Sequence, residues 1–125
     1  MRTATIHLAG KDRLLCFSTR VVRNCTERYG GIEHIGAALS TEDTVKALDE
    51  SMWLLSQMLE AGARYARMNG MDNPEPLDAD GLYDCCDMSD FAGLRGKIME
   101  TISNGQKATV EAEDPKNAGA AQGER

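Results

Sequence analysis

The chain has 125 residues, of which 42% are hydrophobic, with one Trp, three Tyr and two Phe, so we expect a single domain with a small core. Its formal net charge is −6, and an acidic chain without a basic tract lacks the phosphate contacts on which nucleic-acid binding depends. No apolar run approaches the roughly 20 residues that span a bilayer, and the N-terminus does not resemble a secretory signal, so we expect a cytoplasmic protein without membrane contact.

The charge is distributed unevenly. Residues 1–39 carry a net charge of +3, whereas residues 72–90 contain seven acidic and no basic side chains. Such asymmetry favours attraction of a charged partner or head-to-tail self-association. A solvated acidic surface that keeps the protein soluble is the alternative interpretation. The candidate partner-binding residues in this stretch are Asp78, Asp80 and Asp84.

The first 39 residues predict a β-hairpin followed by two helices. Residues 3–8 alternate between polar and apolar side chains, which indicates a half-buried strand, and a turn at 10–13 would lead to a second strand at 14–17. Ser18 or Thr19 is a candidate N-cap for a helix that the glycines at 30–31 would end. Residues 32–39 predict a short second helix.

The strongest predicted element is a long helix at about 41–69. Its apolar positions recur at steps of three and four, and Gly62 interrupts the pattern; these positions are Val45, Leu48, Met52, Leu55 and Leu59. The middle of the helix is apolar nearly all round. Because a small domain has little protein to cover such a helix, we expect part of it to lie in an interface, and we expect a homo-oligomer.

The C-terminal third predicts a linker and two shorter helices. Residues 73–76 contain two prolines and indicate a rigid linker, after which Asp78 or Asp80 would cap a short helix. Ser89 or Asp90 would cap the last helix, which the pair Asn104–Gly105 would end; its apolar stripe comprises Phe91, Leu94, Ile98 and Ile102. Residues 109–113 predict a weak strand.

Together these elements predict an α+β fold that is mostly helical. An N-terminal hairpin would be followed by about four to five helices in a single domain at residues 1–113. Residues 114–125 contain no large apolar side chain that could offset the entropy of ordering them. We therefore expect a flexible C-terminal tail.

The sequence offers no recognisable catalytic or metal-binding motif. Its two histidines, His7 and His34, are far apart, and the vicinal Cys85–Cys86 pair lacks the spacing of zinc ligands. A nucleophile, a base and an orienting group cannot be assembled from these residues. We expect no catalytic residue, no metal, no cofactor and no enzymatic activity.

The seven methionines and the long helix favour a protein-binding function instead. Methionine surfaces adapt to different partners, although filling of the core is the commoner role of methionine. Trp53, Met58 and Tyr65 on the long helix are the candidate anchors for a partner helix. The alternative is that all three belong to the core.

Three stretches of the sequence carry a resemblance to a known family. Taken with the predicted hairpin, residues 14–39 (LLCFSTRVVRNCTERYGGIEHIGAAL), 43–70 (DTVKALDESMWLLSQMLEAGARYARMNG) and 77–111 (LDADGLYDCCDMSDFAGLRGKIMETISNGQKATVE) resemble the tail assembly chaperones of long-tailed phages and prophages. The resemblance covers about residues 3–113. It rests on the order of the predicted elements and on their general residue pattern, and not on an invariant motif.

The resemblance implies a function without catalysis. Such chaperones bind the tape measure protein, help recruit tail tube subunits, tend to self-associate, and leave before the tail is complete. This chain would act in the bacterial cytoplasm and be absent from the finished virion. The family often makes a longer product by programmed frameshifting, and Pro115–Lys116–Asn117 can be encoded by a slippery heptamer. This chain would be the shorter product.

Two other functions remain open at this point. The chain could be a small intracellular adaptor or regulatory protein, or a structural tail subunit that stays in the particle. Both would act by protein–protein binding. Gene neighbourhood separates them from the chaperone, which would lie between a tail tube gene and a very long tape measure gene.

Overall fold

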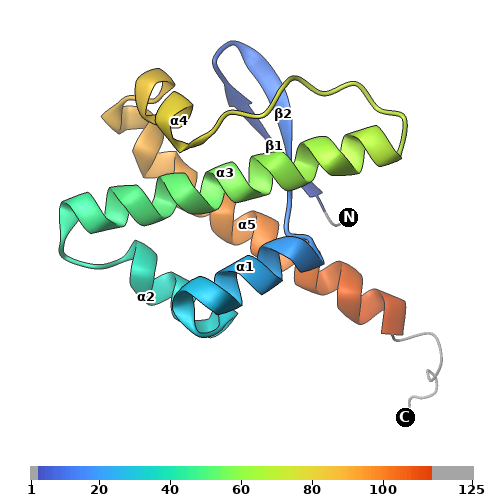
Figure 1. Cartoon of the computed structure of the whole chain (residues 1–125), viewed down its shortest axis with the longest axis horizontal. Helices are drawn as coiled ribbons and strands as arrows, with labels where there is room; N and C mark the ends of the chain where they lie inside the picture. Colours follow the sequence, from blue (N-terminus) through green and yellow to red (C-terminus); the bar gives the residue numbers. More distant parts are fainter. Residues whose placement is uncertain (1–2, 114–125) are drawn as a thin grey trace.

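The N-terminal hairpin and the helices that follow are arranged around one long central helix (Figure 1). The computed structural model describes the backbone of residues 3–113 and the side chains of residues 3–106. The strands are β1 (Thr3–Leu8) and β2 (Lys11–Cys16), and the helical segments are α1 (Thr19–Tyr29), the 3₁₀ turn η1 (Ile32–His34), α2 (Ile35–Leu39), α3 (Thr44–Met68), α4 (Ala79–Cys85) and α5 (Met88–Glu113). The predicted mixed, mostly helical fold is confirmed.

The hairpin is held by a tighter turn than the sequence predicted. Ala9 and Gly10 both have positive φ, 53° and 74°, which is the conformation of a two-residue turn that matches the twist of antiparallel strands. The predicted turn at 10–13 is therefore wrong, and β2 begins at Lys11 and ends at Cys16. The predicted alternation of β1 is confirmed, because Ala4, Ile6 and Leu8 are buried.

The first helices end where their sequence signals predict. The Ser18 hydroxyl accepts a hydrogen bond from the Val21 amide at 3.4 Å and caps α1. At the other end Gly30 adopts the left-handed conformation with φ 87°. The predicted short helix at 32–39 is confirmed as η1 followed by α2.

Helix α3 passes so close to β2 that only glycine fits at the crossing. A Cβ atom at Gly62 would lie 2.0 Å from the backbone oxygen of Leu14. Gly62 is therefore not a weak point of the helix, as its sequence pattern indicated, but the contact that lets helix and strand approach. The helix begins at Thr44, and Asp43 is its N-cap, with its carboxylate accepting the Lys46 amide at 3.2 Å.

The other elements of the chain cover most of α3. Its buried residues extend from Ala47 to Ala66, and β2, α1, α2, α4 and α5 all contact it. The premise that a domain of this size cannot cover this helix is wrong. Within the predicted stripe, Met52, Leu55 and Leu59 are buried, whereas Val45 is 68% exposed at the start of the helix.

The linker between α3 and α4 (residues 69–78), which we call the strap, is hydrogen-bonded to the hairpin. The buried Arg13 donates from Nε to the Leu8 oxygen at 3.1 Å and from Nη1 to the Glu75 oxygen at 2.8 Å. The side-chain oxygen of Asn73 accepts the Leu14 amide at 3.0 Å. These bonds hold the predicted proline-containing linker along β2, and Asp78 then caps α4 by accepting the Gly81 amide at 2.8 Å.

The last helix is longer than predicted at both ends. Asp87 precedes α5 and accepts the Asp90 amide at 3.0 Å, so it is the cap in place of Ser89 or Asp90. The pair Asn104–Gly105 does not end the helix: Asn104 donates to the Thr3 oxygen at 3.0 Å, and a Cβ at Gly105 would lie 2.9 Å from Phe17. Asn104 and Gly105 therefore allow α5 to pack against β1 and against the segment that follows β2.

Helix α5 continues to Glu113, so the predicted strand at 109–113 is wrong. The predicted apolar stripe is confirmed, with Leu94, Ile98 and Ile102 in the core and Phe91 packed against it. The predicted flexible tail at 114–125 and the tripeptide Pro115–Lys116–Asn117 lie outside the described residues.

Replacing Gly62 with Ala tests the crossing of α3 and β2. The new Cβ would overlap a backbone oxygen, so the helix must move, and we expect the free energy of unfolding to fall by about 3 kcal/mol or more. The control is Gly96→Ala in α5, where a Cβ would meet no neighbouring atom; there we expect a gain of up to about 1 kcal/mol from helix propensity. Urea unfolding of both variants measures these changes, and equal stability of the two would contradict the close approach.

Candidate functional site

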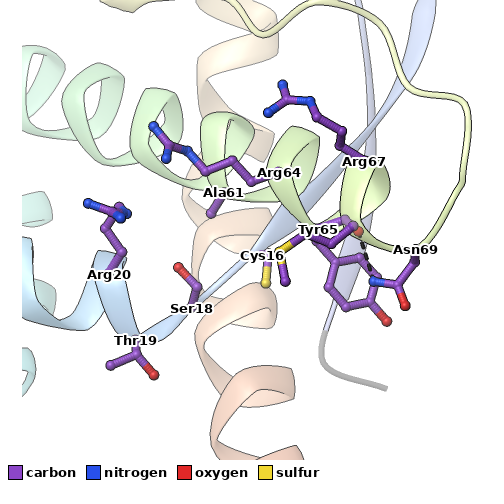
Figure 2. Close-up of a pocket in the computed structure, with 10 residues that line it drawn as sticks. Cys16, Ser18, Thr19, Arg20, Ala61, Arg64, Tyr65, Arg67 and Asn69 are labelled. Atoms are coloured by element: carbon purple, nitrogen blue, oxygen red, sulfur yellow. Dashed lines mark hydrogen bonds between the residues drawn. The ribbon is translucent and has the colours of Figure 1, made fainter.

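A groove opens between the start of α1 and the last turns of α3, and we call it the arginine groove. Its volume is about 710 Å³, and its lining residues come from the segment that joins β2 to α1 (Cys16, Ser18, Thr19 and Arg20) and from the C-terminal end of α3 (Ala61, Arg64, Tyr65, Arg67, Met68 and Asn69). Figure 2 shows the guanidinium groups of Arg20 and Arg64 on one side of the groove, away from Tyr65 and Asn69.

The arginine groove is electropositive. Arg64 pairs with Glu60 on the same helix at 3.3 Å, and both side chains remain about half exposed. Within the described side chains, Arg20 and Arg67 have no ion pair. The N-terminus of α1, which Ser18 caps, adds the positive end of a helix dipole.

The groove also offers apolar surface. Met68 is 84% exposed, the largest exposed fraction among the large apolar side chains described, and the half-buried Tyr65 lies beside it on α3. An apolar floor with a basic rim suits an acidic segment that carries apolar side chains.

The acidic residues gather at the other end of α3, around α4 and the start of α5. We call Asp80, Asp84, Asp87 and Asp90 the acidic face; all four are exposed. Hydrogen bonds from the Ser89 hydroxyl and the Asp90 amide hold the pKa of Asp87 below its usual value. Two apolar side chains stand among these carboxylates, Tyr83 at 39% and Met88 at 66% exposure.

The acidic face and the arginine groove are far apart on the molecule. The Tyr83 hydroxyl donates to the carboxylate of Asp49, which fixes α4 against the N-terminal half of α3. Asp49 precedes Arg64 by about four turns of α3, or roughly 23 Å at 1.5 Å per residue. One molecule therefore presents opposite charges at its two ends.

A third cluster joins α1 to α3 around the single tryptophan. The guanidinium carbon of Arg28 lies 4.3 Å from the centroid of the Trp53 ring, and the Tyr29 ring meets Trp53 edge-on at 5.8 Å between centroids. Glu50 accepts hydrogen bonds from Arg28 at 2.7 and 3.1 Å and from the Tyr29 hydroxyl at 2.7 Å. The Arg28 guanidinium holds the pKa of Glu50 below its usual value.

The six residues that the sequence predicts to bind partners lie in different parts of the structure. Met58 is fully buried, so the alternative core interpretation describes it. Trp53 is half-buried under Arg28 and Tyr29, and Tyr65 lines the arginine groove. Asp78 is the N-cap of α4, whereas Asp80 and Asp84 belong to the acidic face.

The basic side of the groove was not found from the sequence. Arg64 and Arg67 lie three residues apart, which places them on one side of a helix, and this spacing was the available signal. Arg20 lies more than forty residues earlier, and only the fold brings it near the other two. The exposure of Met68 is also set by the fold, because it depends on the point at which the strap leaves α3.

Cysteine thiols and histidine rings are side chains of this chain that could act as nucleophiles, bases or metal ligands. Burial raises the pKa of the Cys25 thiol to about 11 and that of Cys86 to about 12, so both are protonated at neutral pH. Among residues 3–106, no three His, Cys, Asp or Glu side chains are grouped so that they could hold a metal ion. His7 is an exposed strand residue that pairs with Asp12 at 2.7 Å.

Comparison with known proteins finds no family model, no curated protein and no solved structure that matches this chain. In the part of the chain that the structure describes, none of the helices has the length and apolar character needed to cross a membrane.

The pH dependence of stability tests the cluster around Trp53. The folded-state pKa of Glu50 is lowered, so its contribution is present above the unfolded value of about 4.3 and is lost as the pH falls through the folded value. We expect Glu50→Gln to lower the free energy of unfolding at pH 7 by about 1 kcal/mol. This difference from the unmodified chain should shrink as the pH falls below about 4.

The matched control is Glu60→Gln. Glu60 pairs with Arg64 at the surface, where such pairs contribute little, so we expect almost no change at either pH. Urea unfolding between pH 3 and pH 7 measures both variants. A Glu50→Gln difference that stays constant over this range would contradict the assigned ion pair.

Proposed function

We propose that this chain is a phage or prophage tail assembly chaperone that binds the tape measure protein and helps recruit tail tube subunits without catalysis. It would act in the cytoplasm of the bacterial host, as a homo-oligomer, and would be absent from the finished virion. The proposal of this family rests on the sequence resemblance to tail assembly chaperones. The order of elements, a hairpin followed by short helices, a long helix and C-terminal helices, supports it.

The observation that carries a protein-binding function is the exposure of methionine. Among the side chains of residues 3–106, the large apolar ones that are exposed are Val45, Met68, Met71, Tyr83, Met88 and Met99, so four of these six are methionines. Methionine is flexible and polarisable, and surfaces rich in it pack against partners of varied shape. A chaperone that holds many different helical stretches of one long client needs such a surface.

The charged ends of the molecule support the same function. The arginine groove and the acidic face each combine charge with exposed apolar side chains, as docking surfaces for proteins do. The arginine groove is lined partly by α3, and the acidic face is joined to α3 by the Tyr83–Asp49 hydrogen bond. They give the chain two independent places to contact other subunits.

Co-expression with the tape measure protein tests this function. The probe is the product of the very long open reading frame expected downstream of the gene. We expect it to aggregate when expressed alone and to remain in solution, bound to this chain, when the two are co-expressed. The double variant Met71→Ser/Met99→Ser should weaken the complex about tenfold or more, since each change removes apolar contact area.

The control is Val45→Ser, which removes a more exposed apolar side chain, 68% against 45% for Met71 and 44% for Met99, from the start of α3. It should leave the complex unchanged. A tape measure protein that aggregates equally with and without this chain would overturn the proposal. Finding the chain at stoichiometric levels in finished particles would favour the structural tail subunit instead.

A further inference from the structure

We propose that the arginine groove of one copy binds the acidic face of a second copy, so that copies associate head to tail. This inference rests on the self-association included in the proposed function and assigns to it two specific faces. The occupant of the groove is thus a second copy of this chain, presenting α4 and the start of α5.

An acidic occupant suits the groove because Arg20 and Arg67 find no carboxylate among the side chains of residues 3–106. Arg20 and Arg67 have no ion pair within the described side chains, and Arg64 shares its charge with Glu60 while remaining 45% exposed. An incoming carboxylate would supply the ion-pair partner that Arg20 and Arg67 do not have among the described side chains. The exposed Met68 offers apolar surface to an occupant that also carries apolar side chains.

The acidic face supplies both features. Asp84 makes no hydrogen bond or ion pair with any side chain that the structure describes, so its carboxylate is available to a partner. Met88 stands among the carboxylates at 66% exposure. No basic side chain occurs within residues 72–90 to compete for these charges.

Other segments of the chain fit the groove less well. Residues 114–125 contain no large apolar side chain and carry both charge signs, so they match neither the apolar floor nor the basic rim. The acidic face of the same molecule cannot reach the groove, because α4 is held against the N-terminal half of α3 by Tyr83 and Asp49. The pairing must therefore be between copies.

Two different faces at opposite ends give a heterologous contact. Such a contact leaves one groove and one acidic face unoccupied in every dimer, so further copies add until a ring closes or a chain extends. The average mass should rise steadily with concentration. Because the contact is between charged groups at the surface, the mass should fall as salt increases.

Two charge reversals test the pairing without disturbing the fold. Arg20→Glu puts an acidic side chain in the first turn of α1, and Asp84→Lys puts a basic one in the last turn of α4; both changes favour the helix dipole. Thermal unfolding of each variant should therefore occur at or above the temperature of the unmodified chain. Arg20→Glu retains the acidic face, and Asp84→Lys retains the groove.

Light scattering at micromolar concentrations gives the decisive result. The unmodified chain should form species larger than dimers, and each variant alone should associate at least tenfold more weakly. An equimolar mixture of the two variants should form a one-to-one dimer and nothing larger, because the intact groove of one meets the intact acidic face of the other. Lys11→Glu and Glu33→Lys make the same changes in net charge elsewhere and should assemble as the unmodified chain does.

Three results would overturn the pairing. If both variants assemble as the unmodified chain does, the copies associate through other faces, and the self-association in the proposed function stands without this assignment. If the mixture forms no dimer, the two faces do not meet. If the unmodified chain is monomeric at all concentrations, both the pairing and the homo-oligomer fail, while binding of the tape measure protein is measured separately by co-expression.

Discussion

The close approach of α3 to β2 at Gly62 is the constraint on which the rest of the fold depends. With no side chain at this position, the helix lies directly against the backbone of Leu14. The helix can then occupy the middle of the molecule, where the hairpin and four other helices cover it. The strap after α3 returns along β2, and Arg13 and Asn73 fix it there. The positions of both charged faces follow from this arrangement.

Local signals predicted much of the fold because they depend on a few adjacent residues. The alternation of β1, the Ser18 cap, the Gly30 terminus and the apolar stripe of α5 are all properties of short segments. The wrong predictions concern positions whose role is set by tertiary contacts. The sequence pattern predicts an interruption at Gly62 and a helix end at Gly105, yet each is a site of close packing between elements distant in sequence. No local pattern distinguishes these two roles of glycine in a helix.

The binding surfaces were only partly predictable for the same reason. The charge asymmetry was visible in the sequence, and Asp80 and Asp84 indeed lie on an exposed acidic surface. Met58 and Trp53 are candidate anchors from the sequence, with the core as the alternative, because the sequence does not show how much of α3 the chain itself covers. In the structure Met58 is core and Trp53 is stacked under Arg28. The arginine groove combines residues from α1 and α3, which only the fold brings together.

We propose that α3 is buried within a single copy and that the two charged ends of the molecule bind other proteins. Hydrogen–deuterium exchange at low and high protein concentration tests this claim most directly. The middle of α3, residues 51–59, should be protected equally at both concentrations because it is already buried in a single copy. Slower exchange at high concentration should appear around residues 18–20, 61–69 and 80–91. New protection in the middle of α3, with none at these ends, would contradict the account.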